Sequence, residues 1–360
     1  MPDTMSHAST QALLARLNIA LPILQAPMAG VSSPAMAAAV TAAGGLGALG
    51  LGAAGAEGAR RMIAEFTARC TGPLNVNLFT HPAAQADAPR EAAWISRLRP
   101  AFAAYGAEPP ERLGEIYTSF LADDAMLALL LELRPAVVSL HFGLPDAKRL
   151  AALRGAGITL LATVTNLAEA RLAEAAGIDA LVAQGYEAGG HRGMFDPAAP
   201  DDRLGTLALT RLLATQTGLP VIAAGGIMDG AGISAALALG AAAAQLGTAY
   251  IGTAESLADA GYRAALFSEA AHHTVMTSAI SGRPARSLAN RFTALGAALD
   301  AAEIPAYPIA YDLGKALHIA AKAAGEPGYG AQWAGQGAPL ARRMSAAALT
   351  RALAQELRPA

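Results

Sequence analysis

Cysteine is almost absent from this sequence, in which Cys70 is the only one. A single thiol excludes an intramolecular disulfide, and such usage is typical of a reducing compartment, so we expect a cytoplasmic protein. The first residues, MPDTMSHASTQALLARLN, also lack the basic and then apolar layout of a secretory signal peptide.

Charged residues are scarce as well, at 15% of the chain, and the formal net charge is −2. No basic surplus is available to bind nucleic acid or an anionic membrane, so we expect neither as a partner. Hydrophobic residues make up 54% of the 360 positions, which is enough to build a deep core. A small-molecule partner is the interpretation that remains.

Two long windows contain no charge at all, residues 17–56 and 230–254. Each is long enough for a membrane-spanning helix, which needs about 20 mainly apolar residues. Both windows are instead rich in alanine and interrupted by glycine, and the first contains three prolines. This pattern favours buried parallel strands alternating with tightly packed helices.

Short apolar runs recur, each followed by a glycine or polar turn and then by an alanine-rich segment. The runs predict eight strands, at 22–30, 45–52, 74–79, 136–143, 159–164, 180–185, 220–226 and 241–252. Ser33 and Pro34 are typical of a helix start, while Gly177 and Gly240 are typical of helix ends. Eight strands that alternate with helices predict an α/β fold, a closed (β/α)8 TIM barrel.

Two segments depart from this alternation. Residues 80–135 carry several helical patterns and are predicted to be an insertion after the third strand. After residue 252 the strand pattern stops, and 255–325 reads as helical with a proline-rich break, IPAYP, at 304–308. We therefore predict a barrel from residues 1–252 plus 326–360, and a smaller, mainly helical substrate or lid domain from 253–325.

Glycine clusters occur at three predicted strands. GLGALG at 45–50 matches a dinucleotide-binding pattern, but it follows a helical segment, so packing glycines are the better interpretation. AAGGI at 223–227 and QLGT at 245–248 close the last two strands, where barrels often bind phosphate. We predict a phosphate site there, with two ordinary turns as the alternative.

Polar side chains gather at the predicted carboxyl ends of the strands, where barrels place their chemistry. Asn77 and Gln184 offer amides that suit the pyrimidine edge of a flavin, or that cap loops. Met28 suits packing on a ring face or filling of the core. His141, at the end of the fourth strand, is a second candidate for the pocket.

The segment QGYEAGGHRG at 184–193 carries the main candidate for chemistry. A neutral imidazole at His191 can accept a proton from carbon, and the two preceding glycines leave room for a ligand. For Arg192 we expect one of two roles, binding of an anion or an ion pair with Glu187 or Asp196. No cluster of residues has metal-ligand spacing, so we predict no metal.

Several segments in this order, QAPMAG, NVNLF, QGYEAGGHRG, PVIAAGGI, QLGTAYIGTAES and ISGRPAR, resemble the nitronate monooxygenase family. This family was formerly called 2-nitropropane dioxygenases, and the resemblance is to its bacterial class I. It covers residues from about 20 to about 340.

The resemblance implies non-covalent FMN and oxidation of alkyl nitronates by O2 to a carbonyl compound and nitrite. It implies that His191 is the catalytic base and that propionate 3-nitronate is a candidate substrate, and it leaves a homodimer open. The residues that it implies as FMN contacts are Met28, Asn77, Gln184, Gly189, Gly190, Gly225, Gly226, Gln245, Leu246, Gly247, Thr248, Trp333 and Gln336. His141 and Arg192 are expected near the substrate.

The AGGH motif is also similar to barrel flavin reductases that use NAD(P)H, including quinone reductases and an enoyl-acyl-carrier-protein reductase. A third alternative is a non-redox, phosphate-binding barrel enzyme. It would purify colourless, whereas both flavin enzymes would be yellow.

Overall fold

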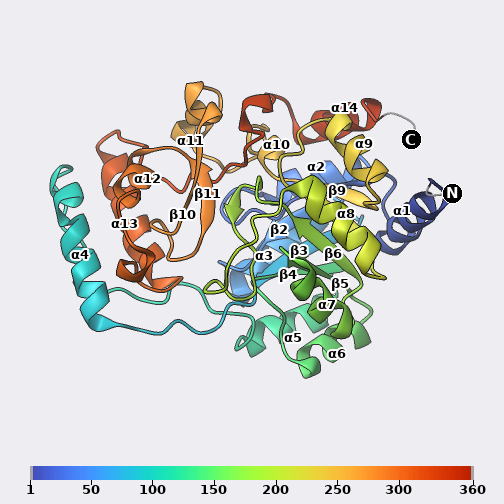
Figure 1. Ribbon diagram of the computed structural model, residues 1–360, viewed down its shortest axis with the longest axis horizontal. Coiled ribbons are helices and arrows are strands. Elements are labelled where there is room, and N and C mark those ends of the chain that lie inside the picture. Colours follow the sequence, from blue (N-terminus) through green and yellow to red (C-terminus); the bar gives the residue numbers. More distant parts are fainter. Residues whose placement is uncertain (1–2, 358–360) are drawn as a thin grey trace.

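The computed structural model describes residues 3–357, and its main feature is a ring of parallel strands (Figure 1). Eight strands form one sheet, in the order β1-β9-β8-β6-β5-β4-β3-β2. They are β1 (Ile23–Gln25), β2 (Gly47–Gly50), β3 (Leu74–Phe79), β4 (Val137–His141), β5 (Thr159–Val164), β6 (Ala180–Gln184), β8 (Val221–Ala224) and β9 (Ala243–Leu246). Leu46 hydrogen-bonds to both Ile23 and Gln25, which joins the first and last strands of this order. The predicted TIM barrel is confirmed.

Helices alternate with these strands and surround the ring (Figure 1). They are α2 (Pro34–Ala42), α3 (Ala56–Thr67), α5 (Asp124–Leu133), α6 (Ala147–Gly155), α7 (Leu167–Ala175), α8 (Thr206–Gln216), α9 (Gly230–Ala238), α10 (Thr248–Ile251) and α14 (Ala346–Gln355). The predicted start of α2 is confirmed, because the Ser33 hydroxyl accepts from the Met36 amide at 2.9 Å.

Side chains of each strand alternate between two cores. Leu181 and Ala183 of β6 pack outward, in the cluster between sheet and helices. Ala180 and Val182 point into the barrel, where α1 (Asp3–Leu17) contributes two buried leucines to the same cluster. Because side chains two apart share a face, Gln184 lies on the inward face at the open end of the barrel.

The glycines around β2 allow close packing, as predicted. A Cβ at Gly47 would lie 2.0 Å from the Ala37 carbonyl oxygen of α2. Only a residue without a side chain lets the helix and the strand approach this closely. The GLGALG match is therefore explained by helix–strand contact.

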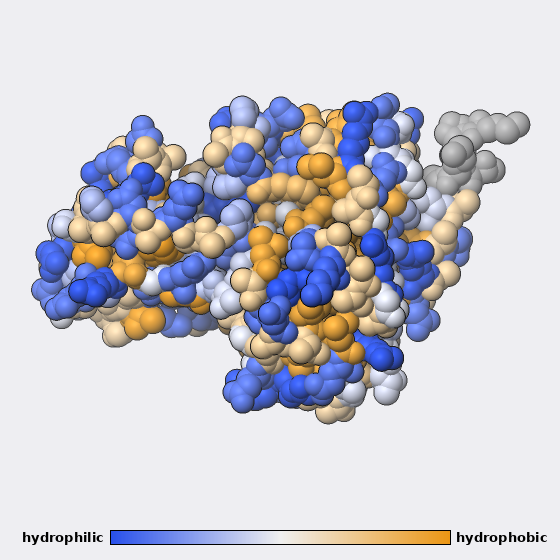
Figure 2. Space-filling view, turned by 90° about the horizontal axis from the view of Figure 1, so that it is seen from below, coloured by the Kyte–Doolittle hydropathy of each residue, from blue (hydrophilic) through white to orange (hydrophobic). Residues whose placement is uncertain are grey.

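A second lobe stands beside the barrel, and seen from below it projects as a distinct mass (Figures 1 and 2). Its elements are α4 (Ala88–Ala103), α11 (Ala260–Leu266), α12 (Arg291–Gly296), α13 (Ile309–Ala323), β10 (Thr274–Thr277) and β11 (Ala285–Leu288). Trp94 and Phe102 of α4 are buried against Leu313 and Leu317 of α13. The insertion after the third strand thus supplies one wall of this lobe.

Strands β10 and β11 were not expected in this segment. They form a small antiparallel sheet with β7 (Gly190–His191), a two-residue strand that extends from the barrel rim. Short strands with mixed burial leave little periodicity for the sequence to reveal. Within the part of the chain that the structure describes, no helix is both long and apolar enough to cross a bilayer.

Candidate active site

A cavity of about 560 Å³ opens at the carboxyl ends of the barrel strands and continues under the second lobe. This volume is within the usual range for small-molecule and cofactor sites. Most residues singled out from the sequence line it. They are Met28, Asn77, His141, Gln184, Gly189, Gly190, His191, Gly225, Gly226, Gln245, Gly247, Thr248 and Trp333.

Three of the residues singled out lie elsewhere. Leu246 is buried in the core beneath the rim, and the Gln336 side chain is exposed. Arg192 is buried and forms a two-pronged ion pair with Asp201, at 2.9 Å for each bond. The pairing expected with Glu187 or Asp196 is replaced, and Glu187 instead accepts from the amide and hydroxyl of Thr206.

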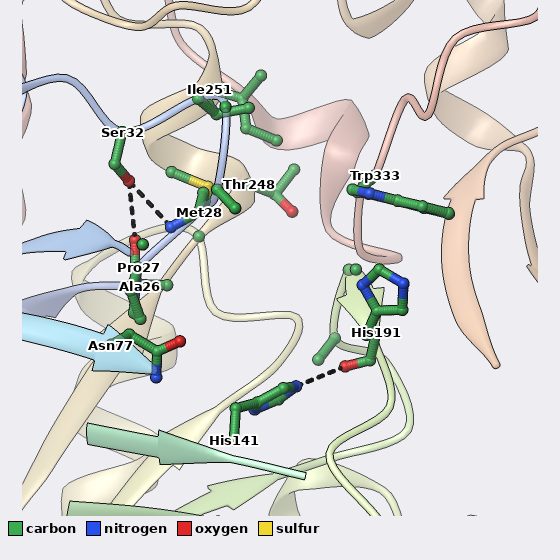
Figure 3. A pocket seen from close by; sticks show the side chains of 18 of the residues that line it. Ala26, Pro27, Met28, Ser32, Asn77, His141, His191, Thr248, Ile251 and Trp333 are labelled. Carbon is green, nitrogen blue, oxygen red and sulfur yellow. Dashed lines mark hydrogen bonds between the residues drawn. The ribbon is translucent and has the colours of Figure 1, made fainter. Parts of the chain in front are cut away.

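The backbone of His191 is held from both sides. Its carbonyl oxygen accepts a hydrogen bond from His141 Nε2 at 3.2 Å (Figure 3). The same oxygen accepts another from Gln184 Nε2 at 2.9 Å. On the other side, His191 pairs with Ala285 of β11. The barrel rim and the second lobe together therefore fix the position of the His191 backbone.

The His191 ring lies in an aromatic enclosure. Its centre is 5.1 Å from the Trp333 ring, 5.3 Å from the Tyr307 ring and 5.7 Å from the Phe142 ring. Its only hydrogen-bonding partner among the described residues is the Ser281 hydroxyl, 2.9 Å from Nε2. No carboxylate between residues 3 and 357 is hydrogen-bonded to the ring, in contrast to an Asp–His pair.

Burial, together with the positive charge that the nearby His141 and Arg283 side chains can carry, lowers the pKa of His191 to about 3. A lowered pKa means that the neutral ring persists at neutral pH and well into the acid range. A neutral imidazole has a lone pair with which it can accept a proton. The enclosure therefore keeps His191 in the form that a base requires.

Arg283 is a buried cation behind the histidines. Its guanidinium carbon lies 4.1 Å from the centre of the Phe142 ring, and its Nε has no partner among the described residues. Burial lowers its pKa to about 10, which leaves it charged at neutral pH. Its positive field disfavours an additional charge on the nearby imidazoles.

The two rim amides differ in how far the protein already uses them. Asn77 Nδ2 donates to the backbone oxygen and the hydroxyl of Ser139, and no bond within the described residues uses Oδ1. Gln184 donates to the His191 carbonyl and accepts from the Gly193 amide at 2.7 Å. Gln184 thus caps the loop around His191, which is one of the two roles that the sequence left open for this amide.

The further residues that line the cavity include four with chemically active side chains that the sequence did not single out, namely Tyr117, Tyr307, Tyr311 and Lys315. Burial raises the pKa of each of these tyrosines, so their hydroxyls remain protonated and able to donate. The Tyr307 hydroxyl is buried without a partner in the described chain. The Lys315 ammonium lies 4.8 Å from the centre of the Tyr117 ring.

Sequence signals for these four residues were weak. The IPAYP segment indicates only a proline-rich break, and Lys315 lies one helical turn beyond Tyr311 within α13. Among residues 3–357, no group of three His, Cys, Asp or Glu side chains is arranged to hold a metal ion.

Comparison with known proteins agrees with this geometry. The family model described as nitronate monooxygenase matches residues 10–356. The chain belongs to this family. It is 64% identical over 348 residues to a nitronate monooxygenase of Paraburkholderia phytofirmans, covering 97% of this chain and 95% of that protein. It is 54% identical to the nitronate monooxygenase of Pseudomonas aeruginosa, covering 95% and 97%.

Solved structures show the same architecture. A nitroalkane oxidase from Streptomyces ansochromogenes superposes with a TM-score of 0.87 at 42% identity, covering 96% of this chain and 98% of that one. FabK from Thermotoga maritima superposes with a TM-score of 0.69 at 27% identity, covering 96% and 95%. Membership of the nitronate monooxygenase family makes this chain an oxidoreductase, and its relatives support nitronate oxidation as its reaction class.

Proposed function

We propose that this protein binds FMN and uses O2 to oxidise alkyl nitronates to a carbonyl compound and nitrite. The observation that carries the proposal is the placement of His191. Its neutral imidazole faces a cavity of cofactor size, is fixed by both lobes and has no carboxylate partner in the described part of the chain. Family membership supplies the reaction class, and the cavity supplies candidates for each role.

The residues that line the cavity fit FMN. Gly225 and Gly226 have φ values of 123° and 70°, a conformation that favours glycine. They line the cavity together with Gly247 and Thr248, and no side chain of the two glycines fills the space there. Such a cradle suits the phosphate, and the free Asn77 Oδ1 suits an N–H on the edge of the ring system. When bound, the flavin would accept electrons from the nitronate and pass them to oxygen.

His191 acts at an earlier point for one class of substrate. A nitronate is already deprotonated at carbon, whereas a neutral nitroalkane must first lose that proton. Accepting it would place an imidazolium in a buried site, which is costly. The nitronate anion formed in the same step would lie beside it and offset part of that cost.

Lys315 and the tyrosines form the substrate side of the cavity. The Lys315 ammonium is 4.8 Å and 5.3 Å from the ring centres of Tyr117 and Tyr311, and the side chain is exposed at the cavity edge. A cation there would attract a substrate that carries a second negative group. This supports propionate 3-nitronate, which adds a carboxylate to the nitronate, as the substrate.

Replacing Lys315 by methionine tests that assignment. We expect KM for propionate 3-nitronate to rise about fivefold, the upper range for a partly solvated ion pair, with little change for ethyl nitronate. Steady-state kinetics on both substrates measures the difference. Lys322→Met is the matched control, because Lys322 pairs with Asp259 at 2.7 Å and lines only the adjoining cavity. An equal rise for both substrates would contradict the carboxylate role of Lys315.

An anaerobic titration tests the proposed reaction itself. We expect a yellow protein whose flavin absorbance bleaches when ethyl nitronate is added and is unchanged after NADH or NADPH. Prompt bleaching by either nicotinamide would favour the second candidate, a flavin reductase, which the AGGH motif also resembles. A colourless protein that does not take up added FMN would overturn both flavin functions.

A further inference from the structure

We infer that Ser281 is a positioning residue that fixes the tautomer of His191, with the proton on Nε2 and the lone pair on Nδ1. Nδ1 is then the atom that takes the proton from a nitroalkane. The assignment of the tautomer comes from hydrogen bonds in the protein, and its catalytic meaning rests on the proposed function. The inference names both the basic atom and the side chain that makes it basic.

Two hydrogen bonds of Ser281 determine whether its hydroxyl donates to His191 or accepts from it. Its hydroxyl oxygen lies 2.9 Å from His191 Nε2 and 3.2 Å from the backbone oxygen of Arg283. A carbonyl oxygen has no proton to give, and a serine hydroxyl has only one. Ser281 therefore donates to Arg283 and accepts from His191, so the ring must carry its proton on Nε2.

The opposite assignment would be costly. If Ser281 donated to His191, its oxygen and the Arg283 oxygen would face each other as two acceptors 3.2 Å apart. Ser281 is 0% exposed, so the protein encloses the hydroxyl that would have to turn. An unsatisfied buried acceptor is disfavoured, and the first assignment leaves none here.

Both partners of Ser281 are held in place. The Arg283 guanidinium is stacked on Phe142 and donates to the Met194 carbonyl, so the carbonyl of the same residue belongs to an anchored segment. His191 is held through its own carbonyl by Gln184 and His141, as described above. The hydroxyl thus connects two fixed points, and the ring is oriented as well as protonated on one side.

The other ring nitrogen is directed to the cavity. Nδ1 has no hydrogen-bond partner among the residues that the structure describes, while His191 itself lines the cavity. Figure 3 shows one nitrogen of the ring turned toward the side where Met28 and Thr248 lie, and the other turned away. A lone pair on Nδ1 would meet a substrate, whereas an N–H in that position would not accept its proton.

Nitrogen NMR of the flavin-loaded protein, labelled with ¹⁵N-histidine, reads the tautomer directly. The protonated and unprotonated nitrogens of a neutral ring resonate far apart, and a His191→Asn sample identifies the His191 signals by their loss. We expect the wild-type ring to be protonated on Nε2. Protonation on Nδ1 would overturn the inference, whatever the enzyme turns over, so this reading is independent of the proposed function.

Ser281→Ala tests the role of the hydroxyl. It removes the acceptor for Nε2–H, so we expect the Nδ1–H form to become populated. We also expect turnover of neutral nitroethane to fall about tenfold, as for loss of one hydrogen bond, with ethyl nitronate nearly unchanged.

Ser287→Ala is the matched control for this variant. Ser287 lies in β11, is also 0% exposed, and donates a hydrogen bond to the backbone carbonyl of Gln332. The Ser287→Ala variant should change neither the tautomer of His191 nor the ratio of the turnover rates on nitroethane and ethyl nitronate. If Ser281→Ala keeps both at wild-type values, Ser281 does not position His191. If that variant does not fold, the wild-type spectrum still decides which nitrogen is protonated.

Discussion

Replacing His191 by asparagine is expected to lower turnover of neutral nitroethane by about 10² to 10⁴, the usual contribution of an acid–base group. Turnover of ethyl nitronate should fall far less, because that substrate has already lost its proton. The bonds that hold the segment use the carbonyl of residue 191 rather than its ring, so the substitution preserves them. Stopped-flow or oxygen-consumption rates on the two substrates measure the contrast.

The flavin content of the variant should equal that of the wild type, since the ring is not part of the glycine cradle. His273→Asn is a suitable control, because His273 is exposed and does not line the cavity. Equal losses on the neutral and the ionised substrate would remove the base role from His191. They would indicate that the ring orients the substrate or shields the site from water.

Gly226→Val is expected to raise the dissociation constant of FMN at least tenfold. Gly226 has a φ of 70°, and a branched residue in this left-handed region costs about 1–2 kcal/mol or more. A Cβ there would meet Glu187 Cβ at 3.4 Å, an acceptable contact, so the strain arises from the backbone. The turn beside Thr248 would relax, and the phosphate contact predicted there would weaken. Fluorescence titration of the apoprotein with FMN measures the change.

Gly55→Val is the matched control for this substitution. Gly55 is the N-cap residue that precedes α3 and has an extended backbone. A Cβ there meets nothing within 4 Å, and the residue lies outside the cavity lining. It should retain wild-type affinity for FMN. Unchanged affinity in both Gly226→Val and Thr248→Val would show that the phosphate binds elsewhere.

Much of the barrel could be predicted from local patterns. Each predicted run contains a strand, because a strand covered on both faces is mainly apolar. The last run, 241–252, is the exception in extent, since β9 ends at Leu246 and Thr248–Ile251 form α10. The inward face at each carboxyl end then places residues such as Asn77, His141 and Gln184 at the cavity. The family resemblance, rather than this alternation, implied Leu246 as a cofactor contact. Leu246 belongs to the outward-facing set of β9 and lies in the core between sheet and helices.

Other parts of the candidate site depend on contacts between segments far apart in the chain. Asp201, rather than Glu187 or Asp196, pairs with Arg192, because the loop between them folds back on itself. Lys315 reaches the cavity because α13 packs against α4 of the insertion. The residue pattern within each segment does not predict which distant segment it will contact.

The sequence by itself determined the barrel and the polar rim at the ends of its strands, since these follow from the local alternation of apolar and polar residues. It also marked His191, which two glycines precede, as the candidate for chemistry. The tertiary structure decided what surrounds that histidine. Ser281 lies 90 positions from His191, yet its hydroxyl is 2.9 Å from the ring. Hydrogen-bond direction and burial depend on where folded segments meet, so the form in which His191 is held could be read only from the assembled fold.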